Sequence, residues 1–345
     1  MKLSDFKYPL PRNLIAKYPA KPRDASRLMV LNKSDESIAE MKFHDITNFF
    51  TKGDCLVINE TKVFSARLFG KKEKTNAKIE VFLLRELNQE DNIWDVIVDP
   101  ARKVRIGNKI YFDDGKIWCE VIDNTTSRGR TVRFNYKADL FKIIERIGYT
   151  PLPYYIKRDS EEADKEAYQT VYAKNIGSVA APTAGLHFTK RLLASLERKG
   201  VRIAPVTLHL GLGSFRPVEV EDLSKHKMDS EYFEIPQSTA DVVNRTIDNR
   251  GNVFVCGTST VRAVESCVTT TGHLKANRGW TDKFIFPPYD FKIVDRLITN
   301  FHMPESTLLM MACAFAERDF VMKAYKKAIK ERWRFFSYGD AMLIV

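Results

Sequence analysis

The stretch STADVVNRTIDNRGNVFVCGTSTVRAVE, residues 238–265, decides the fold class. It predicts a helix that begins near Ser238, where Asp241 three residues on resembles a capping box, and that ends at Gly251. The apolar face of this helix would be formed by Val242, Val243 and Ile247. A buried strand at 253–255 and a polar turn at 257–262 follow. One helix, one strand and one polar turn in sequence are typical of an α/β protein.

The same unit occurs upstream. Thr189 can cap a helix that ends at Gly200, and an apolar extended run at 201–210 follows it. Leu192, Leu193 and Leu196 would form the buried face of that helix. We also predict a long final helix from about Ser306 to Trp333, apolar early and basic late. Helices that alternate with strands indicate a sheet covered by helices.

Residues 67–149 have a different hydrophobic pattern. Apolar and polar residues alternate at 79–83, 94–98 and 132–136, which is the pattern of half-buried strands. Asp113-Asp114-Gly115 separates two further short strands and favours a type I′ hairpin. The sequence therefore predicts two domains: a mixed α/β domain from residues 1–66 and 150–345, and an all-β insertion at 67–149.

The charge of the chain favours a polyanionic partner. Lys and Arg number 55 against 44 Asp and Glu, a formal net charge of +11. Basic residues gather at 71–74, at 102–105 and at 128–133. A fourth group recurs at helical spacing near the C-terminus and is our candidate RNA-binding face: Lys323, Lys326, Lys330 and Arg334.

Several classes of protein are disfavoured. The five cysteines form no CxxC pair, and the six histidines form no metal-ligand spacing, so we expect no metal. Gly211-Leu212-Gly213 lacks a dinucleotide fingerprint, because Arg216 stands where the third glycine belongs. The start of the chain lacks the apolar region of a signal peptide, and the most apolar run, 308–315, is too short to span a bilayer. We expect a cytoplasmic protein without membrane contact.

Four polar segments remain, each at the end of a predicted strand or the start of a helix. They are APTAGLHF at 181–188, HLGLGSFRP at 209–217, GTSTVR at 257–262 and NFHMPEST at 300–307. Ligands of open α/β sheets bind at such strand ends, where loop backbone and helix N-termini are free. We expect these segments to form one site.

These segments carry a resemblance that spans the chain. DFKYPLPRNLIAKYP, RDASRL, AAPTAGLHF, VTLHLGLGSFRPV, GTSTVRAVES, the long run TDKFIFPPYDFKIVDRLITNFHMPESTLLM and RFFSYGDAMLI are similar to the S-adenosylmethionine:tRNA ribosyltransferase-isomerase family of queuosine biosynthesis. Three positions, Asp229, Pro288 and Glu60, depart from the family pattern and are not taken as catalytic candidates.

The resemblance implies a large mixed α/β domain with a barrel-like insertion. It also implies transfer and rearrangement of the ribosyl group of S-adenosylmethionine, a co-substrate, with no prosthetic group. The acceptor would be a 7-aminomethyl-7-deazaguanine at the wobble position of a tRNA anticodon stem-loop. The products would be epoxyqueuosine, adenine and methionine. We expect a monomer.

The chemistry needs proton transfers near neutral pH, which suit histidine. Our catalytic candidates are His209 and His187, with His302 as a third, and Glu265 as the carboxylate that faces the sulfonium or steers the amine. An ion pair of Glu265 with Arg262, one helical turn earlier, is the structural alternative. The substrate-binding candidates are Thr183, Gly185, Gly211, Gly213, Arg216, Thr258, Thr260, Arg262 and Asn300.

Two other functions stay open at this point. An S-adenosylmethionine-dependent RNA methyltransferase would share the charge and the co-substrate, although the usual glycine-rich loop is missing. A catalytically silent RNA-binding module could stack bases on aromatic residues such as Phe284, Phe286 and Tyr289.

Overall fold

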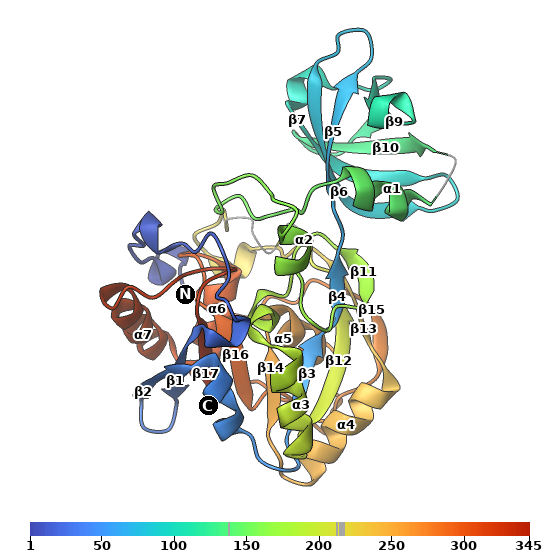
Figure 1. Cartoon of the computed structure of the whole chain (residues 1–345). Helices are drawn as coiled ribbons and strands as arrows, with labels where there is room; N and C mark the ends of the chain where they lie inside the picture. Colours follow the sequence, from blue (N-terminus) through green and yellow to red (C-terminus); the bar gives the residue numbers. More distant parts are fainter. Residues whose placement is uncertain (137–138, 212, 214–217) are drawn as a thin grey trace.

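The computed structural model describes residues 1–136, 139–211, 213 and 218–345 and shows a large body with a smaller one attached (Figure 1). The large body is built on a nine-stranded sheet. Its order is β15 (Asn277–Thr281), β13 (Glu231–Ile235), β12 (Arg202–Leu208), β3 (Cys55–Asn59), β14 (Val253–Cys256), β16 (Arg296–Asn300), β17 (Ala341–Ile344), β1 (Arg27–Asn32) and β2 (Ser37–Lys42).

The centre of this sheet is parallel. β12 and β14 both pair in parallel with β3, and β14 pairs in parallel with β16. The outer strands β13, β15 and β2 run antiparallel to their neighbours, as does β17 to β16. β3 and β14 are continuous apolar runs because parallel strands at the centre of a sheet are buried on both faces. The carboxyl ends of four adjacent strands therefore meet at one edge.

Helices cover both faces of the sheet. One apolar layer joins Cys55 and Val57 of β3 to α4 (Gln237–Asp248), α5 (Thr258–Glu265), α6 (Thr307–Ala316) and α7 (Arg318–Lys330). The other joins Leu56 and Ile58 to α3 (Lys190–Arg198) and to the 3₁₀ helix Phe43–Phe49. Alternate residues of one strand thus belong to different cores, as the period of a strand requires.

Most elements predicted from the sequence are confirmed, with two corrections in the helices. α3 is capped as expected, since the Leu192 amide donates to the Thr189 hydroxyl at 3.1 Å. α4 begins at Gln237 after Pro236, so Ser238 lies inside the helix and does not cap it. The final helix is not continuous: α6 ends at Ala316 and α7 begins at Arg318, because Glu317 has a φ of +61°, outside the helical range.

The smaller body is a closed six-stranded barrel, which confirms the predicted fold class. Its strands are β5 (Arg67–Lys72), β6 (Lys78–Asn88), β7 (Ile93–Asp99), β8 (Lys109–Phe112), β9 (Ile117–Asn124) and β10 (Gly129–Asn135). The alternating residues fill its core together with Leu140 and Ile144 of α1 (Leu140–Ile147). The Asp113-Asp114-Gly115 turn does join two antiparallel strands. However, Phe112 pairs with Ile117, so the loop has four residues and is no two-residue type I′ turn.

A narrow neck joins the barrel to the sheet (Figure 1). The chain enters the barrel after β4 (Thr61–Val63), which pairs with β11 (Asn175–Ser178), and returns through Tyr149. Arg67 and Tyr149 face each other there and exchange backbone hydrogen bonds of 2.9 and 3.3 Å. The short helix α2 (Asp164–Ala167) follows the return crossing. The domain limits inferred from the sequence stay a prediction.

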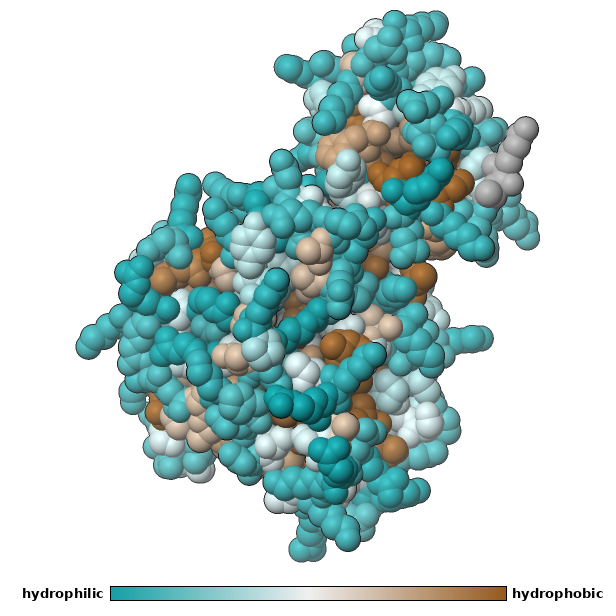
Figure 2. All heavy atoms as spheres, viewed as in Figure 1, coloured by the Kyte–Doolittle hydropathy of each residue, from teal (hydrophilic) through white to brown (hydrophobic). Residues whose placement is uncertain are grey.

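The surface in view is mostly hydrophilic on both bodies (Figure 2). Within the described part of the chain, none of the helices has the length and apolar character needed to cross a bilayer. All five cysteines are buried free thiols. The apolar material is gathered in the cores on the two sides of the sheet and inside the barrel.

We predict that Phe254→Ala lowers the free energy of unfolding by about 3–5 kcal/mol, because it empties the centre of the sheet. Phe254 is fully buried on β14 and stacks on Phe50 with ring centroids 3.8 Å apart. Urea denaturation measures the change. Leu87→Ala, at a side chain 46% exposed on β6, is the control and should change stability by less than about 0.5 kcal/mol. Equal effects would contradict the assignment of the core.

Candidate active site

The candidate site lies along the edge where the parallel strands end. In sheet order, β12 leads to His209, β3 to Thr61, β14 to Thr258, and β16 to Asn300 and His302. Three of the four polar segments singled out in the sequence begin here, and the fourth, 181–188, contacts β16 through the 3₁₀ helix Thr183–His187. The topology thus brings together segments far apart in the chain.

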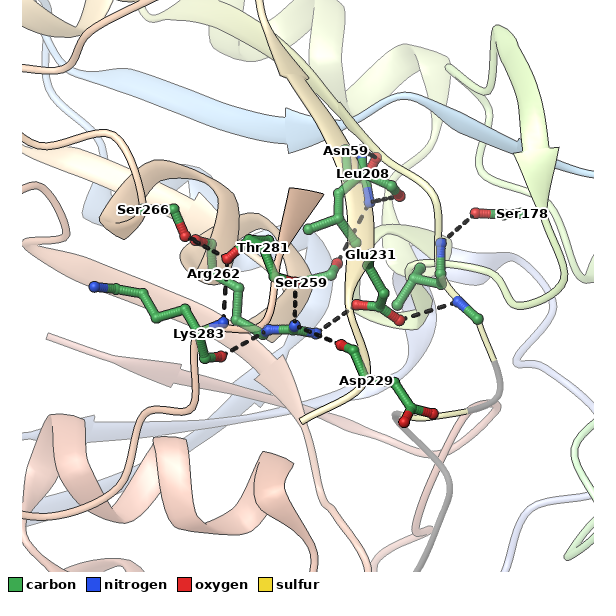
Figure 3. Close-up of polar contacts among 12 residues, drawn as sticks. Asn59, Ser178, Leu208, Asp229, Glu231, Ser259, Arg262, Ser266, Thr281 and Lys283 are labelled. Carbon is green, nitrogen blue, oxygen red and sulfur yellow. Dashed lines mark hydrogen bonds and ion pairs between the residues drawn. The ribbon is translucent and has the colours of Figure 1, made fainter. Parts of the chain in front are cut away.

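Buried polar side chains form hydrogen bonds to the backbone of successive residues at the end of β12 (Figure 3). Asn59 donates to the Leu208 carbonyl at 2.9 Å and accepts from the Leu208 amide at 3.0 Å. The Ser178 hydroxyl accepts from the Leu210 amide at 2.7 Å, and the Glu231 carboxylate from the Gly211 amide at 3.0 Å. These partners come from β3, β13 and β11, so strands distant in the sequence set the geometry of residues 208–211.

His209 sits in the middle of this held segment. Its Nδ1 lies 2.8 Å from the Thr61 hydroxyl, which in turn lies 2.8 Å from the Ser178 hydroxyl. The imidazole packs against Gly177, where a Cβ would approach the ring to 2.6 Å, and stacks on Tyr232. Burial lowers the pKa of His209, so the ring is neutral at pH 7. Nε2 has no hydrogen bond to a described residue, which leaves it able to take a proton.

His187 belongs to a second group. Asn300 Nδ2 lies 3.1 Å from His187 Nε2, and the Ser26 hydroxyl lies 2.8 Å from Nδ1, while the ring stacks on Phe43. An amide donor at Nε2 requires the tautomer with its proton on Nδ1. Thr183 donates to Asn300 Oδ1 at 3.2 Å. Burial lowers the pKa of His187 to about 4. Both ring nitrogens of His187 have hydrogen-bond partners. His187 is therefore placed to orient Asn300 and has no unbonded nitrogen for proton transfer.

His302 is also buried. Its Nε2 lies 2.7 Å from the Thr299 hydroxyl, and its backbone is held on both sides, by an amide that donates to Tyr325 and a carbonyl that accepts from Tyr8. Burial lowers its pKa to about 3. Together with Thr183 and Asn300 it lines a small cavity of about 30 Å³.

A larger cavity of about 810 Å³ adjoins this small one, since both are lined by Tyr155, Met303 and Phe336. Its walls are mostly apolar or aromatic, and charged residues complete the lining: Arg12, Lys17, Lys157 and Glu305. Val218, nine residues after His209, also lines it. The size and the apolar walls are those of a site for a small organic molecule.

The histidines do not converge on one atom. β12 and β16 are separated by β3 and β14, and three strand spacings place the two ends roughly 14 Å apart. His209 and the pair His187 and His302 therefore serve different parts of an extended site.

Glu265 and Arg262 have partners other than those expected from the sequence; Figure 3 shows those of Arg262. Glu265 accepts from the amides of Lys292 and Ile293 at 3.1 and 2.9 Å and from the Tyr289 hydroxyl at 3.1 Å, so it anchors the 289–294 loop. The structural alternative, an ion pair between Glu265 and Arg262, does not form among the described residues. Arg262 is buried, pairs with Glu231, and donates to the carbonyls of Lys283 and Thr281 at 3.0 and 3.1 Å.

The other substrate-binding candidates divide into available and occupied groups. Thr258 opens α5 after Gly257, whose φ of +91° favours glycine. Thr260 is fully buried and donates to the Cys256 carbonyl at 2.5 Å. Gly185 packs under Tyr172, and Gly213 against Asp229, each with no room for a Cβ. Arg216 lies outside the described residues.

The predicted RNA-binding face is only partly present. Lys323, Lys326 and Lys330 are exposed on α7 and form no ion pair within the described chain. Arg334 is not on that face, because α7 ends at Lys330 and Arg334 pairs with the buried Asp340 at 2.8 Å. This placement corrects the sequence-based expectation.

Asn59, Thr61, Ser178 and Glu231 were missed by sequence reasoning. A usable signal existed for two of them, since the apolar run at 55–58 ends in Asn-Glu-Thr, a polar triplet at a strand end. Of the three departures from the family pattern, Glu60 accepts from Asn175 at 3.0 Å, Asp229 packs on Gly213, and Pro288 follows a cis bond.

The fold and the site define an α/β protein with a held imidazole at the end of β12, a ligand-sized cavity lined in part by Met303 beyond the end of β16, and an inserted barrel. A family model described as "Queuosine biosynthesis protein" matches residues 3–344. The chain belongs to this family.

Relatives agree over the full length. The chain is 61% identical to the S-adenosylmethionine:tRNA ribosyltransferase-isomerase of Cytophaga hutchinsonii and 59% identical to that of Chloroherpeton thalassium, covering 100% of both chains in each case. Among solved structures it is similar to the S-adenosylmethionine tRNA ribosyltransferase of Thermotoga maritima, with a TM-score of 0.57 and 35% identity. That match covers 99% of this chain and 100% of the other.

We predict that Arg262→Met lowers the free energy of unfolding by about 3–5 kcal/mol, because it removes a buried charge partner of the Glu231 carboxylate. The double variant Arg262→Met/Glu231→Gln should regain much of this loss, since glutamine can still accept from the Gly211 amide. Denaturant unfolding of the two variants and the parent gives both values. A double variant no more stable than the single one would show that the two residues are not coupled.

Proposed function

We propose that this chain is an S-adenosylmethionine:tRNA ribosyltransferase-isomerase. It transfers and rearranges the ribosyl moiety of S-adenosylmethionine onto 7-aminomethyl-7-deazaguanine at the tRNA wobble position, giving epoxyqueuosine and releasing adenine and methionine. The observation that carries this proposal is identity of up to 61%, over the whole chain, to enzymes that bear this name. The geometry of the strand edge supports it.

The donor occupies the cavity of about 810 Å³ in this proposal. Its aromatic and apolar walls, Tyr155, Phe336 and Met303 among them, suit a nucleoside, and its charged lining suits the amino-acid end of the donor. Thr183 and Asn300 adjoin the cavity through the small extension lined by His302 and would hold polar groups of the donor.

His209 is the proton-transfer group that we propose. The sulfonium of the donor acidifies the neighbouring ribose methylene, and a neutral base can remove that proton. His209 is neutral because burial lowers its pKa, its Nδ1 is oriented by Thr61, and Nε2 is available. Ring opening then breaks the bond between the ribose and adenine, whose departing nitrogen takes up the proton that His209 removed. The neutral aminomethyl nitrogen forms the new bond to the ribosyl group and gives up a proton, and cleavage of the bond between the ribose methylene and the sulfonium sulfur releases methionine.

The other candidates act by positioning in this proposal. His187 orients Asn300, and His302 shapes the small cavity beside it. Glu265 fixes the 289–294 loop, and Arg262 supports Glu231, which holds the Gly211 amide. Thr258 stays available to the substrates, whereas the backbone amide of Gly211 is held by Glu231. The lysines of α7 are candidates for phosphate contacts.

The methyltransferase alternative receives no support from the relatives, whose names specify ribosyl transfer. A silent binding module is disfavoured because it would not need a buried imidazole held by Thr61 at the strand edge. We further propose that the enzyme works as a cytoplasmic monomer on the anticodon stem-loop.

We predict that the enzyme, S-adenosylmethionine and tRNA bearing the aminomethyl base yield adenine and methionine in equal amounts. Chromatography of the small-molecule products measures both. Unmodified tRNA, with guanine at the wobble position, offers no aminomethyl nucleophile and is the control that should give no transfer. S-adenosylhomocysteine as the product would exclude ribosyl transfer and favour the methyltransferase.

We predict that His209→Asn cuts turnover by about 10²–10⁴-fold, the usual effect of losing a positioned base, while melting and tRNA affinity stay nearly unchanged. In the parent enzyme turnover should be level above pH 7 and fall as the pH drops through the pKa of His209, which burial holds below 6.5. The reason is that protonation removes the basic form. The variant should lose this acidic limb.

Gly177→Ala is the matched variant, because it keeps the imidazole but displaces it through the close Cβ contact. It should reduce turnover and retain the acidic limb. Exchange of the ribose methylene proton with solvent, in enzyme and donor alone, should vanish in His209→Asn. A fully active His209→Asn would remove this residue from the mechanism.

A further inference from the structure

A basic hollow of about 580 Å³ lies on the barrel, away from the strand edge described above. Its lining contains four cations and no carboxylate: Lys72, Arg102, Lys103 and Arg105, with Thr75, Ala77 and Asn108. Two basic clusters, separate in the sequence, meet here because the β5–β6 turn lies against the β7–β8 connection. Lys72 links the two segments by donating to the Lys103 carbonyl at 2.8 Å.

The hollow is at the far end of the barrel. β5 starts at the neck, where Arg67 bonds to Tyr149, and runs outward for six residues, roughly 20 Å. β6 is antiparallel to β5, and β7 to β6, so β7 also ends at the outer rim. Both turns that form the hollow therefore lie at the outer rim of the barrel, on the side away from the large sheet (Figure 1).

A buried arginine builds this rim. Arg130 is only 7% exposed, and its guanidinium donates to the carbonyls of Ala101 and Val104 at 3.0 Å and of Gly129 at 2.7 Å. It forms no ion pair within the described chain. Arg130 thereby fixes the backbone at Ala101 and Val104, and the side chains of Arg102 and Lys103 between them are exposed. A buried cation matched only by carbonyls, beneath four more cations, leaves strong positive charge uncompensated.

We propose that this hollow binds phosphate groups of the tRNA backbone as a second anchor, while the wobble base occupies the strand edge. The proposal rests on the proposed function for the identity of the RNA. Phosphate is the anion that tRNA presents repeatedly, and arginine forks match its oxygens. The third basic cluster of the sequence does not join the hollow as a free surface, because Arg130 is buried and Arg128 lies 3.4 Å from Asp99.

The test uses the full-length variant Arg102→Ala/Arg105→Ala. Both side chains are exposed, so folding should be unaffected, which thermal melting checks. Affinity for unmodified tRNA transcript, measured by fluorescence anisotropy over a range of salt, should fall roughly tenfold or more. The slope of log affinity against log salt should shrink by about 2, one for each lost phosphate contact. Arg102→Lys/Arg105→Lys keeps the charge and should retain most of the affinity.

The control is Arg198→Ala/Arg245→Ala, which removes the same charge from exposed positions on α3 and α4. An equal loss in this control would overturn the proposal, because net charge alone would explain it. Unchanged affinity and slope in Arg102→Ala/Arg105→Ala would overturn it as well.

Kinetics separate this proposal from the proposed function. In the adenine-release assay the hollow variant should raise the KM for modified tRNA and leave kcat and the KM for S-adenosylmethionine unchanged. A loss of kcat with unchanged tRNA affinity would overturn the second anchor. If the parent released no adenine at all, the proposed function would fail, whereas the binding measurements on tRNA transcript would still decide the anchor.

Discussion

The candidate active site depends on one constraint. The backbone amides and carbonyls at the end of β12 need hydrogen-bond partners at the point where the pairing between strands ends. Asn59, Ser178 and Glu231 supply these partners to residues 208–211. A buried amide or carbonyl left unpaired would cost about 1–3 kcal/mol. Because the partners come from β3 and β13 of the large sheet and from β11 of the two-stranded sheet, the position of His209 depends on segments outside its own loop.

Burial then decides what each imidazole can do. Burial lowers the pKa of His187 to about 4 and that of His302 to about 3, so both imidazoles are neutral near pH 7. His187 also has both ring nitrogens occupied, which makes it a fixed part of the scaffold. His209 is neutral for the same reason, but its Nε2 faces no described partner. In the proposed mechanism, proton transfer falls to His209 because its Nε2 has no hydrogen-bond partner among the described residues, and not because of its residue type.

The two buried arginines, Arg262 and Arg130, have different kinds of partner. Arg262 is matched by the Glu231 carboxylate, which also holds Gly211, so the pair stabilises the site internally. Arg130 is matched by carbonyls alone, and its charge is not cancelled. The neutralised pair of Arg262 and Glu231 suits a site that must stay rigid. The charge of Arg130, which carbonyls do not neutralise, suits a surface that attracts an anion.

The sequence by itself determined the α/β alternation, the barrel strands and the four polar segments, because the periods of helices and strands and the turn residues are local properties. It also carried the family resemblance. It could not show that Glu265 serves a loop, that Arg262 pairs with Glu231, or that Glu317 breaks the last helix, since these depend on residues distant in the chain. Only the tertiary structure decided which histidine keeps a free nitrogen and which cations share one hollow. The physical reason is that hydrogen-bond partners and burial are set by packing between elements, which no local pattern records.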